Sequence, residues 1–445
     1  METVTLPQIW QDHRSALLRI FCVALVLRLF VFAAMLGQMD RDQMAGATPD
    51  AGRYVEAATH ILEEGDFHTV GVNIFGPGYP LFLAGTGGLV TSHPAFLILV
   101  QIILSAVGSA AIAVLALQIT GNRRVAWTAA LLNALSLASV FLANVLLSDT
   151  LYFATTLVGM VLFIHALHKC SLAGYIAAGI LLAAAALTRS VGMFVPLLLI
   201  VAGYCAWPRT RPPLPRKRIL PALIPGFIVL IVVTGWALRP RAPEETAIPM
   251  AGAIGIQKAA SLVRAEVEGI SYSEAQTRFA AEVDSLRIAE NRHVNRVFPA
   301  HARLTLMNLL LDHPATTTHV LLKNIRDNTN DPWNLGPIVL PQWKNEISNL
   351  ARRMARTGLK YRVSLLALIG LIIMLVRRHY RPALVLTSVY VYYAALSGFS
   401  LWQGNRIFYP GQISWAILCA VTLVTGGEAG MRGVRQILGR RRRSA

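Results

Sequence analysis

The residue best suited to chemistry in this sequence is Asp50, which precedes a predicted surface helix in a polar loop. From Tyr54 to Glu64, apolar residues return at helical spacing and leave the other face polar. This pattern predicts a short amphipathic helix that lies on the membrane surface. Asp is a favoured helix N-cap, so the spacing alone favours a capping role for Asp50. The alternative, which is compatible with capping, is a catalytic carboxylate that acts as a general base.

A second acidic candidate is Asp149, which follows Ser148 between two long apolar blocks. A carboxylate so close to hydrocarbon is costly unless it is paired or functional. We therefore interpret Asp149 either as the N-cap of the next span or as a second catalytic residue.

Two arginines, Arg189 and Arg406, lie at the ends of spans on the same predicted side as these acids. Arginine binds phosphate oxygens through two parallel hydrogen bonds, so both are candidate phosphate ligands. The alternative is that they extend toward lipid headgroups.

Arg28 is a cation inside the first apolar block, where a charge marks a functional site by default. We prefer a structural interpretation slightly, in which Arg28 pairs with a carboxylate elsewhere in the bundle. The histidines show no spacing that specifies a metal, and His60 and His68 are weak candidates only because they lie near Asp50. The sequence predicts no metal ligand and no certain cofactor.

Composition predicts an all-α membrane protein: 55% of the 445 residues are hydrophobic and only 14% are charged. Apolar blocks long enough to cross a bilayer recur along the chain, and we predict about ten spans. They lie at 16–36, 94–118, 125–146, 150–167, 171–188, 191–207, 219–238, 362–376, 382–398 and 412–426. The stretch Tyr79–Val90 is too short to span and is predicted to be re-entrant or surface-lying.

Charge sets the predicted orientation. With both termini in the cytoplasm, every dense basic cluster falls on the cytoplasmic side, including the tail Arg440–Arg443. The formal net charge of +18 therefore reflects loops at a cell (inner) membrane and does not indicate nucleic-acid binding.

Three regions follow from this arrangement. Residues 1–238 form an N-terminal membrane bundle whose first outer loop, 37–90, is the predicted catalytic loop. Residues 239–361 form a mostly helical extracytoplasmic cap. Residues 362–445 form the last membrane helices and the basic tail.

The order of these motifs resembles the GT-C superfamily of polyprenyl-phosphate-sugar glycosyltransferases, near the protein O-mannosyltransferase and aminoarabinose-transferase type. The resemblance is carried, in order, by Asp50 before Arg53-Tyr54, Pro77-Gly78-Tyr79-Pro80, Gly121-Asn122-Arg123-Arg124, Ser148-Asp149, and Arg406 before Tyr409-Pro410. In this sequence Ala51 follows Asp50, whereas many members have Asp-Glu there. A divalent metal used by some members is left open by the resemblance.

The resemblance implies a transferase that moves a sugar from a polyprenyl-phosphate carrier to an acceptor hydroxyl on the extracytoplasmic side. Asp50 would be the general base of an inverting displacement, with Asp149 as the second catalytic residue. The implied substrate-binding residues are Arg53, Tyr54, Tyr79, Arg189, Arg406 and Tyr409.

Two other function classes share the carrier and the topology. A transporter or flippase of lipid-linked sugar explains the spans, but the sequence shows none of the internal repeats common in transporters. A polymerase or ligase of surface polysaccharide is disfavoured by the position of the acidic loop directly after the first span.

Overall fold

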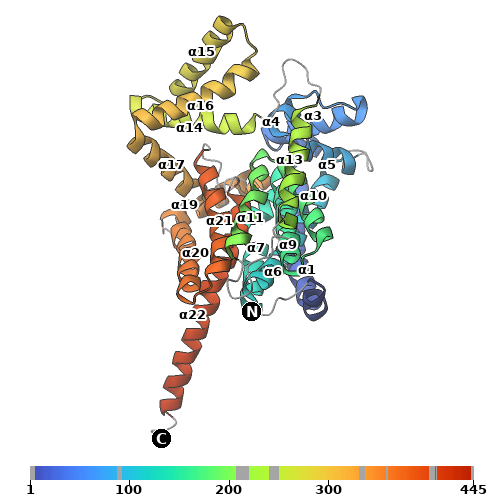
Figure 1. Cartoon of the computed structure of the whole chain (residues 1–445), viewed down its shortest axis with the longest axis vertical. Coiled ribbons are helices and arrows are strands. Elements are labelled where there is room, and N and C mark those ends of the chain that lie inside the picture. Colours follow the sequence, from blue (N-terminus) through green and yellow to red (C-terminus); the bar gives the residue numbers. More distant parts are fainter. Residues whose placement is uncertain are drawn as a thin grey trace.

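Helices make up every regular element in the part of the chain that the structure describes (Figure 1). The structure is a computed structural model that describes residues 6–87, 93–206, 220–239, 250–329, 336–356, 359–399, 406 and 408–441. The predicted all-α class is confirmed for these residues. The basic loop around Arg216 and the end of the tail at Arg443 lie outside them.

All ten apolar blocks predicted as spans fall on helices that run side by side in one bundle (Figure 1). The bundle consists of α1 (Leu6–Leu36), α6 (Pro94–Thr120), α7 (Arg123–Ala134), α8 (Leu137–Ala143), α9 (Ser148–Lys169), α10 (Leu172–Thr188), η1 (Ser190–Phe194), α11 (Val195–Ala206), α13 (Ile224–Ala237), α20 (Leu359–Val376), α21 (Tyr380–Gly398), η3 (Tyr409–Gly411) and α22 (Gln412–Arg441). Helix α6 packs against α1, α7 and α9, and α22 packs against α7 and α20.

The bundle is that of a multi-pass membrane protein. Five stretches of the described chain are long and apolar enough to cross a membrane, and α7 with α8, bent by 52°, provides a sixth if it counts as one span. The apolar stretches in α10, in η1 with α11, and in α20 are shorter than these spanning stretches. Length and composition therefore support fewer spans than the ten predicted.

Four short helices precede α6 and lie at one end of the bundle: α2 (Arg41–Ala45), α3 (Pro49–Glu64), α4 (Val70–Phe75) and α5 (Gly78–Gly87). The predicted surface helix is α3, which buries Tyr54, Ala57 and Ala58 along one face. The predicted N-cap was wrong by two residues: Thr48 accepts the capping hydrogen bond from the backbone of Ala51, at 3.1 Å. Pro49 at the first helical position is already in the helix, so Asp50 lies in the first turn.

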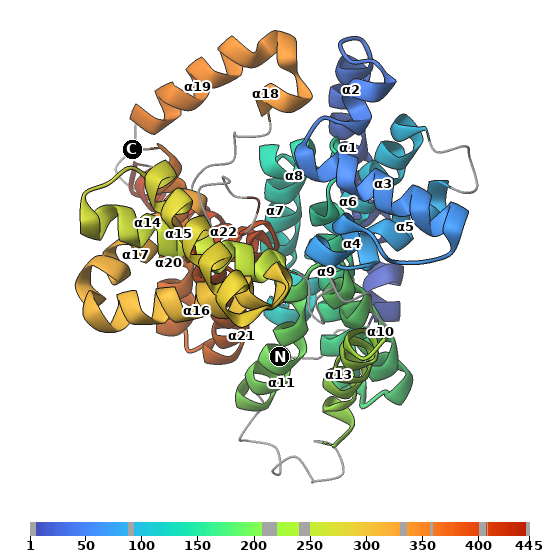
Figure 2. The ribbon, with the colours of Figure 1, turned by 90° about the horizontal axis from the view of Figure 1, so that it is seen from above.

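A second helical group covers the same end of the bundle and is called the cap here. It comprises α14 (Ala251–Glu268), α15 (Tyr272–Glu290), α16 (Val294–Asp312) and α17 (Pro314–Thr329), followed by α18 (Gly336–Val339), η2 (Pro341–Trp343) and α19 (Lys344–Arg356). Seen from above, α14–α17 lie over one half of the bundle and α3–α5 over the other half (Figure 2). The cap has its own small core, formed by Phe279, Val283, Val297 and Ala302.

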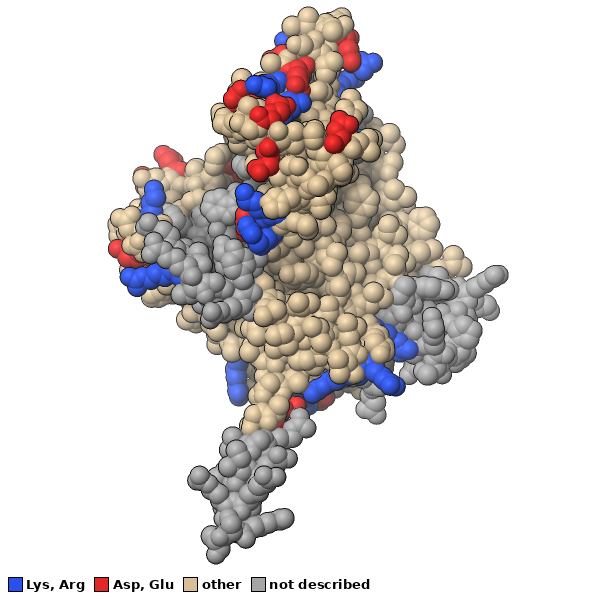
Figure 3. Space-filling view, turned by 90° about the vertical axis from the view of Figure 1, so that its left-hand side faces the viewer, with Lys and Arg blue, Asp and Glu red and all other residues tan. Residues whose placement is uncertain are grey.

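Charge is distributed unevenly along the long axis. On the face shown in Figure 3, charged side chains of both signs gather on the cap side, and mostly Lys and Arg lie toward the opposite end. An uncharged band separates them (Figure 3). Apolar side chains of the bundle helices are exposed, such as Phe30 of α1, Ile231 of α13 and Ile372 of α20. This is the surface expected of a protein surrounded by lipid.

Candidate active site

The two candidate acids occupy equivalent positions in two helices. Asp50 is the second residue of α3, and Asp149 is the second residue of α9. The N-cap of α9 is Leu147, so the predicted capping role of Asp149 was also wrong. The partial positive charge at a helix N-terminus stabilises a carboxylate in the first turn, which makes both positions favourable for an anion.

Arg406 joins the two acids. Its Nη1 lies 2.8 Å from Oδ2 of Asp50, and its Nε lies 2.9 Å from Oδ2 of Asp149. The three residues come from the first loop, the start of α9 and the turn before α22. No local sequence pattern links them, and the fold alone brings them together.

Arg189 completes the group by donating through Nη1 to Oδ1 of Asp149. It is the residue after α10, and its backbone N–H caps that helix by donating to the carbonyl of Ala185 at 2.9 Å. Two anions and two cations thus form one neutral cluster, which we call the Asp50–Arg406 cluster (Asp50, Asp149, Arg189 and Arg406).

Exposure differs sharply within the cluster. The side chain of Asp149 is 1% exposed, whereas those of Asp50, Arg189 and Arg406 are 23%, 20% and 14% exposed. Asp149 is therefore the buried anchor of both arginines, and Asp50 is the acid that an incoming molecule can reach.

The two aspartates of the cluster also stabilise the charged form of Arg406. Burial by itself would lower the pKa of its guanidinium, but the carboxylates of Asp149 and Asp50 outweigh burial and raise that pKa. Burial raises the pKa of Tyr54 beneath the cluster to about 12, and the charge of Arg406 opposes this only in part. Arg406 is thus a permanent cation and Tyr54 a neutral hydrogen-bond donor.

Tyr54 and Tyr79 pack against each other, and Tyr54 contacts the residue that precedes Asp149. Their rings meet edge to face with centroids 4.6 Å apart, and the Tyr54 hydroxyl donates to Ser148 Oγ at 3.0 Å. The Tyr79 hydroxyl donates to Gln101 Oε1 at 2.7 Å. Gly78 is needed beside them, because a Cβ at this position would lie 2.5 Å from the backbone nitrogen of Thr188. The glycine lets α5 approach the residue that precedes Arg189.

Two predicted substrate-binding residues are placed differently. Arg53 is exposed on α3, and among the described residues no ion pair joins it to the cluster. Tyr409 is fully buried, lies 3.0 Å from Ser139 Oγ through its hydroxyl and stacks on Phe153 with centroids 4.5 Å apart. Tyr54 and Tyr79 are buried as well. In this structure the tyrosines position other groups and do not line an open site.

Comparison with known proteins supports the resemblance. Residues 77–241 match the family described as dolichyl-phosphate-mannose-protein mannosyltransferase. The archaeal oligosaccharyltransferase AglB from Archaeoglobus fulgidus, in complex with an inhibitory peptide and a dolichol-phosphate, is similar over 96% of this chain and 52% of its own, with a TM-score of 0.56 and 12% identity. The chain has the GT-C fold.

Two further structures extend this comparison. The Archaeoglobus fulgidus oligosaccharyltransferase in complex with Zn and sulfate has a TM-score of 0.52 and 13% identity, over 94% of this chain and 50% of that one. ArnT from Cupriavidus metallidurans, bound to undecaprenyl phosphate, has a TM-score of only 0.38 and 15% identity, over 92% of this chain and 78% of that one. The chain spans about half the length of the oligosaccharyltransferases it resembles. No curated protein sequence matches it.

Within this GT-C fold, the buried positive charge of Arg28 is stabilised by polar groups of the surrounding helices. Its side chain is fully buried and donates to hydroxyls of Ser105 (2.8 Å) and Ser139 (2.6 Å) and to the carbonyl of Ala134 (3.3 Å). The predicted carboxylate partner is therefore wrong for the described residues. Ala134 ends α7 at the bend before α8, where free carbonyls carry the negative end of the helix dipole. These carbonyls and hydroxyls take the place of an acid.

Sequence reasoning missed the polar residues that hold these groups. Gln101, Ser105 and Ser109 all lie on α6 at intervals of four residues and are all fully buried. They support Tyr79 and Arg28. The signal was present, because polar residues on one helix face inside an apolar block indicate contacts within the bundle.

A divalent metal does not fit the acids of this GT-C fold in the observed arrangement. Between Asp50 and Asp149, where a shared cation would have to lie, the Arg406 guanidinium already contacts both carboxylates. A separate group of His60, Glu64 and Asp66 lies at the other end of α3. There Nδ1 of His60 faces Glu64 at 3.0 Å and Nε2 faces Asp66 at 2.6 Å. A metal takes only one ring nitrogen, so this group resembles a hydrogen-bonded relay more than a metal site.

Proposed function

We propose that this protein is an integral membrane glycosyltransferase that moves a sugar from a polyprenyl-phosphate carrier to an acceptor hydroxyl. The observation that carries the proposal is Arg406, a permanent cation that bridges Asp50 and Asp149 at the cap side of the bundle. Phosphate recognition needs a guanidinium and proton removal needs a carboxylate, and the cluster supplies both. The matched family and the dolichol-phosphate in the AglB complex support the same donor class.

In the proposed reaction, the donor phosphate binds Arg406 with the help of Arg189. The acceptor oxygen forms a bond to the anomeric carbon while the bond from that carbon to the phosphate oxygen breaks. Asp50 takes the acceptor proton, and the polyprenyl phosphate leaves with the bonding electron pair. The arginines stabilise the charge that develops on the leaving group, and a single displacement inverts the anomeric carbon.

The resting cluster implies an order of events. Asp50 already binds Arg406, so a bound phosphate competes with Asp50 for the same guanidinium. Donor binding then frees the Asp50 carboxylate to accept a proton. Asp149 stays buried and keeps both arginines in place. It acts in this proposal as a positioning residue.

The proposal includes an orientation. The cap, α3–α5 and the Asp50–Arg406 cluster would face the extracytoplasmic side of the inner membrane. The start of α1 and the end of α22 lie at the other end of the bundle, which would be cytoplasmic (Figure 1). The Lys and Arg side chains near that end support this orientation.

The experiment compares wild type, Asp50→Asn and the control Asp42→Asn in proteoliposomes. Each receives radiolabelled polyprenyl-phosphate sugars and a cell-envelope extract as the acceptor source. Asp42 is an exposed acid of the same loop, outside the cluster. We expect Asp50→Asn to lower transfer by a factor of about 10² to 10⁴, and Asp42→Asn to leave it unchanged. Folding should survive, because Thr48 and not Asp50 caps α3.

Two outcomes would contradict the proposal. Equal transfer by wild type and Asp50→Asn would remove Asp50 from the reaction and move the search to Asp149. No transfer, with movement of labelled lipid between leaflets, would instead indicate a flippase.

A further inference from the structure

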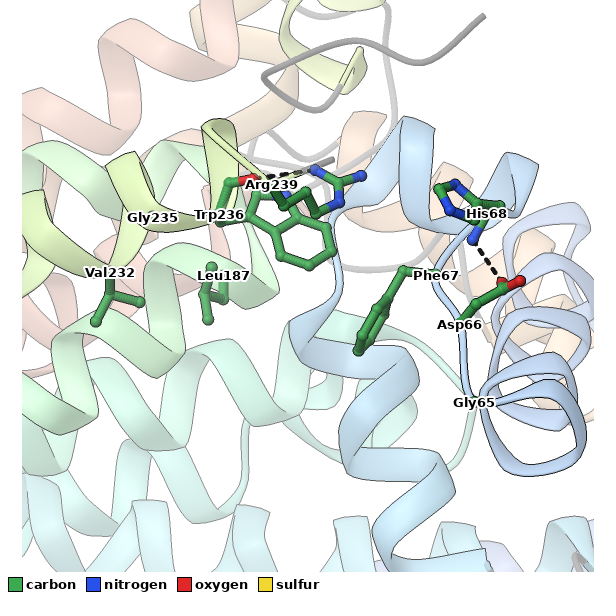
Figure 4. Close-up of a pocket in the computed structure, with 9 residues that line it drawn as sticks. All are labelled: Gly65, Asp66, Phe67, His68, Leu187, Val232, Gly235, Trp236 and Arg239. Atoms are coloured by element: carbon green, nitrogen blue, oxygen red, sulfur yellow. Dashed lines mark hydrogen bonds between the residues drawn. The ribbon is translucent and has the colours of Figure 1, made fainter. Parts of the chain in front are cut away.

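A cavity of about 470 Å³ lies between the loop that follows α3 and the helices α10 and α13 (Figure 4). It is bounded by the loop after α3 and by the ends of α10 and α13. Asp50 lies in the first turn of α3 and Asp66 just beyond its last residue, about 20 Å along the helix, whereas the lining residue Leu187 lies close in sequence to Arg189 of the cluster. None of the lining residues belongs to the cluster.

The lining is apolar on one side and polar on the other. Leu187 and Val232 come from the membrane helices α10 and α13 and form an apolar wall. Asp66, His68 and Arg239 come from segments outside these helices and form a polar rim, with Asp66 and His68 on the side opposite Leu187 and Val232 (Figure 4). An apolar wall from membrane helices next to charged side chains matches the two-part polarity of a lipid, which has a hydrocarbon part and a headgroup.

Helix α13 offers a lateral path from the bilayer. On this helix Phe227, Leu230 and Ile231 are 57%, 60% and 68% exposed. Apolar side chains that are so exposed on a spanning helix face lipid, so the cavity lies beside the lipid that surrounds the protein. A lipid can therefore reach it without leaving the membrane.

Among the described residues of the rim, Arg239 is a cation held in a defined position. The Arg239 guanidinium lies 3.6 Å from the centre of the Trp236 ring, and its Nη1 donates to the Trp236 carbonyl at 3.1 Å. Phe67 packs edge-on against Trp236, with ring centroids 5.4 Å apart. A guanidinium stacked on an aromatic ring is preorganised to bind a phosphate oxygen.

The described part of the rim also holds an anion, the carboxylate of Asp66. Oδ1 of Asp66 accepts from the backbone N–H of His68 at 2.9 Å and lies 2.6 Å from His60 Nε2. These contacts lower the pKa of Asp66, with the His68 hydrogen bond as the main cause. The side chain remains 39% exposed, so the carboxylate is ionised, fixed and accessible.

We propose that this cavity binds a zwitterionic phospholipid from the leaflet on the cap side. The phosphate would bind Arg239, the headgroup ammonium would bind Asp66, and the first part of the hydrocarbon would lie along Leu187 and Val232. Among the described rim residues, a polyprenyl phosphate or an anionic phospholipid matches Arg239 alone, and its negative charge is repelled by Asp66. The rim charges therefore favour a ligand that carries both signs.

The test measures lipid binding to the purified full chain in detergent. Native mass spectrometry counts the retained lipid, and thermal unfolding measures the stabilisation. The probes are phosphatidylethanolamine, phosphatidylglycerol with the same acyl chains, and a polyprenyl phosphate. We expect wild type to retain one phosphatidylethanolamine and to prefer it to phosphatidylglycerol by about tenfold.

The variants test the phosphate-binding residue Arg239 and the ammonium-binding residue Asp66 separately. Asp66→Asn should abolish the preference while phosphatidylglycerol still binds, and Arg239→Gln should weaken both phospholipids. Arg239→Lys keeps the positive charge and should keep binding, which separates lost binding from lost folding. The matched controls are Arg292→Gln and Glu290→Gln, an exposed pair on the cap whose charges lie 3.1 Å apart.

Two results would overturn the proposal. One is an unchanged lipid preference in Asp66→Asn. The other is displacement of phosphatidylethanolamine by an equimolar amount of polyprenyl phosphate, which would assign the cavity to the carrier. Because no readout depends on sugar transfer, failure here is distinct from failure of the proposed glycosyltransferase.

Discussion

At the scale of single residues, burial separates two acids that look alike in sequence. Asp50 and Asp149 both occupy the second position of a helix and both contact Arg406. Asp149 is almost completely buried between two arginines, whereas Asp50 meets one arginine and remains partly exposed. Removing the charge of Asp149 leaves two half-buried cations without their common partner, and this is costly because buried charges need compensation.

Asp149→Asn should therefore lower the free energy of unfolding by about 3 kcal/mol, and Asp50→Asn by less than about 1 kcal/mol. Both should reduce sugar transfer. Reversible unfolding in mixed detergent micelles measures the difference. Equal losses of stability in the two variants would contradict the assignment of Asp149 as the buried anchor.

Arg28 allows a second test at this scale. Arg28→Met leaves the Ser105 and Ser139 hydroxyls and the Ala134 carbonyl with fewer partners inside the bundle. We expect a loss of about 2 kcal/mol, against about 1 kcal/mol for Ser139→Ala, because unsatisfied buried polar groups are costly. The same unfolding measurement applies. The double variant Arg28→Met with Ser139→Ala is the control. If it loses no more free energy of unfolding than Arg28→Met alone, the Arg28–Ser139 hydrogen bond accounts for the effect of Ser139→Ala.

At the scale of elements, helix ends place the chemistry. Thr48 caps α3, the unwound turn after α10 carries Arg189, and the bend between α7 and α8 receives Arg28. Each of these points leaves backbone groups without helical partners, and those groups attract charge. In the cap, charged side chains are instead held by side chains on other helices. Glu282 of α15 contacts Arg264 of α14 and His301 of α16, both at 2.8 Å.

Glu282 makes the stability of the cap depend on pH. Burial would raise its pKa, but the hydrogen bonds from His301 and Arg264 outweigh burial and lower it. A lowered carboxyl pKa contributes stability that is fully present above the unfolded value, near 4.5, and is lost as the pH falls through the folded pKa. Glu282→Gln should therefore unfold at a lower temperature than wild type at pH 6.

The difference between Glu282→Gln and wild type should shrink as the pH falls below about 4.5 and through the lowered pKa of folded Glu282, where wild-type Glu282 becomes protonated. Thermal midpoints of the full chain between pH 6 and pH 3.5 measure it. Glu274→Gln, an exposed pair on the same helix with Arg278, is the control. A difference that does not change with pH would show that the Glu282 charge contributes nothing.

At the scale of the whole molecule, the cap and the short helices α3–α5 share one end of the bundle, and Lys and Arg lie near the other end (Figures 1 and 3). The orientation that we propose can be tested with a native residue. Cys170 is exposed at the end of α9 and would be cytoplasmic, whereas Ser285 is exposed on α15 and would be extracytoplasmic.

A membrane-impermeant maleimide should label Ser285→Cys in intact cells, and should label Cys170 only after the membrane is permeabilised. Each variant carries a single cysteine, with the other cysteines replaced by serine. The positive-inside distribution of charge is the physical reason for this expectation. Labelling of Cys170 in intact cells would reverse the orientation and place the proposed active site in the cytoplasm.

The sequence by itself determined the helical class, the membrane setting, and the amphipathic helix over residues 54–64, although it placed Asp50 before that helix and not in its first turn. These features depend on the hydrophobicity and spacing of neighbouring residues, which local reading detects. It also singled out the residues of the Asp50–Arg406 cluster, because charge near hydrocarbon is unusual wherever it occurs.

Only the tertiary structure decided which of these residues meet. The sequence favoured Arg406 as the phosphate ligand, with Arg189 or Arg53 as an assisting cation. Helix packing brings Arg406 between two aspartates and leaves Arg53 on the surface. Arg28 was expected to find an acid and finds carbonyls at a helix bend and serine hydroxyls on α6 and α8. The energy of a buried charge depends on every group around it in space, and residues more than a hundred positions apart supply those groups here.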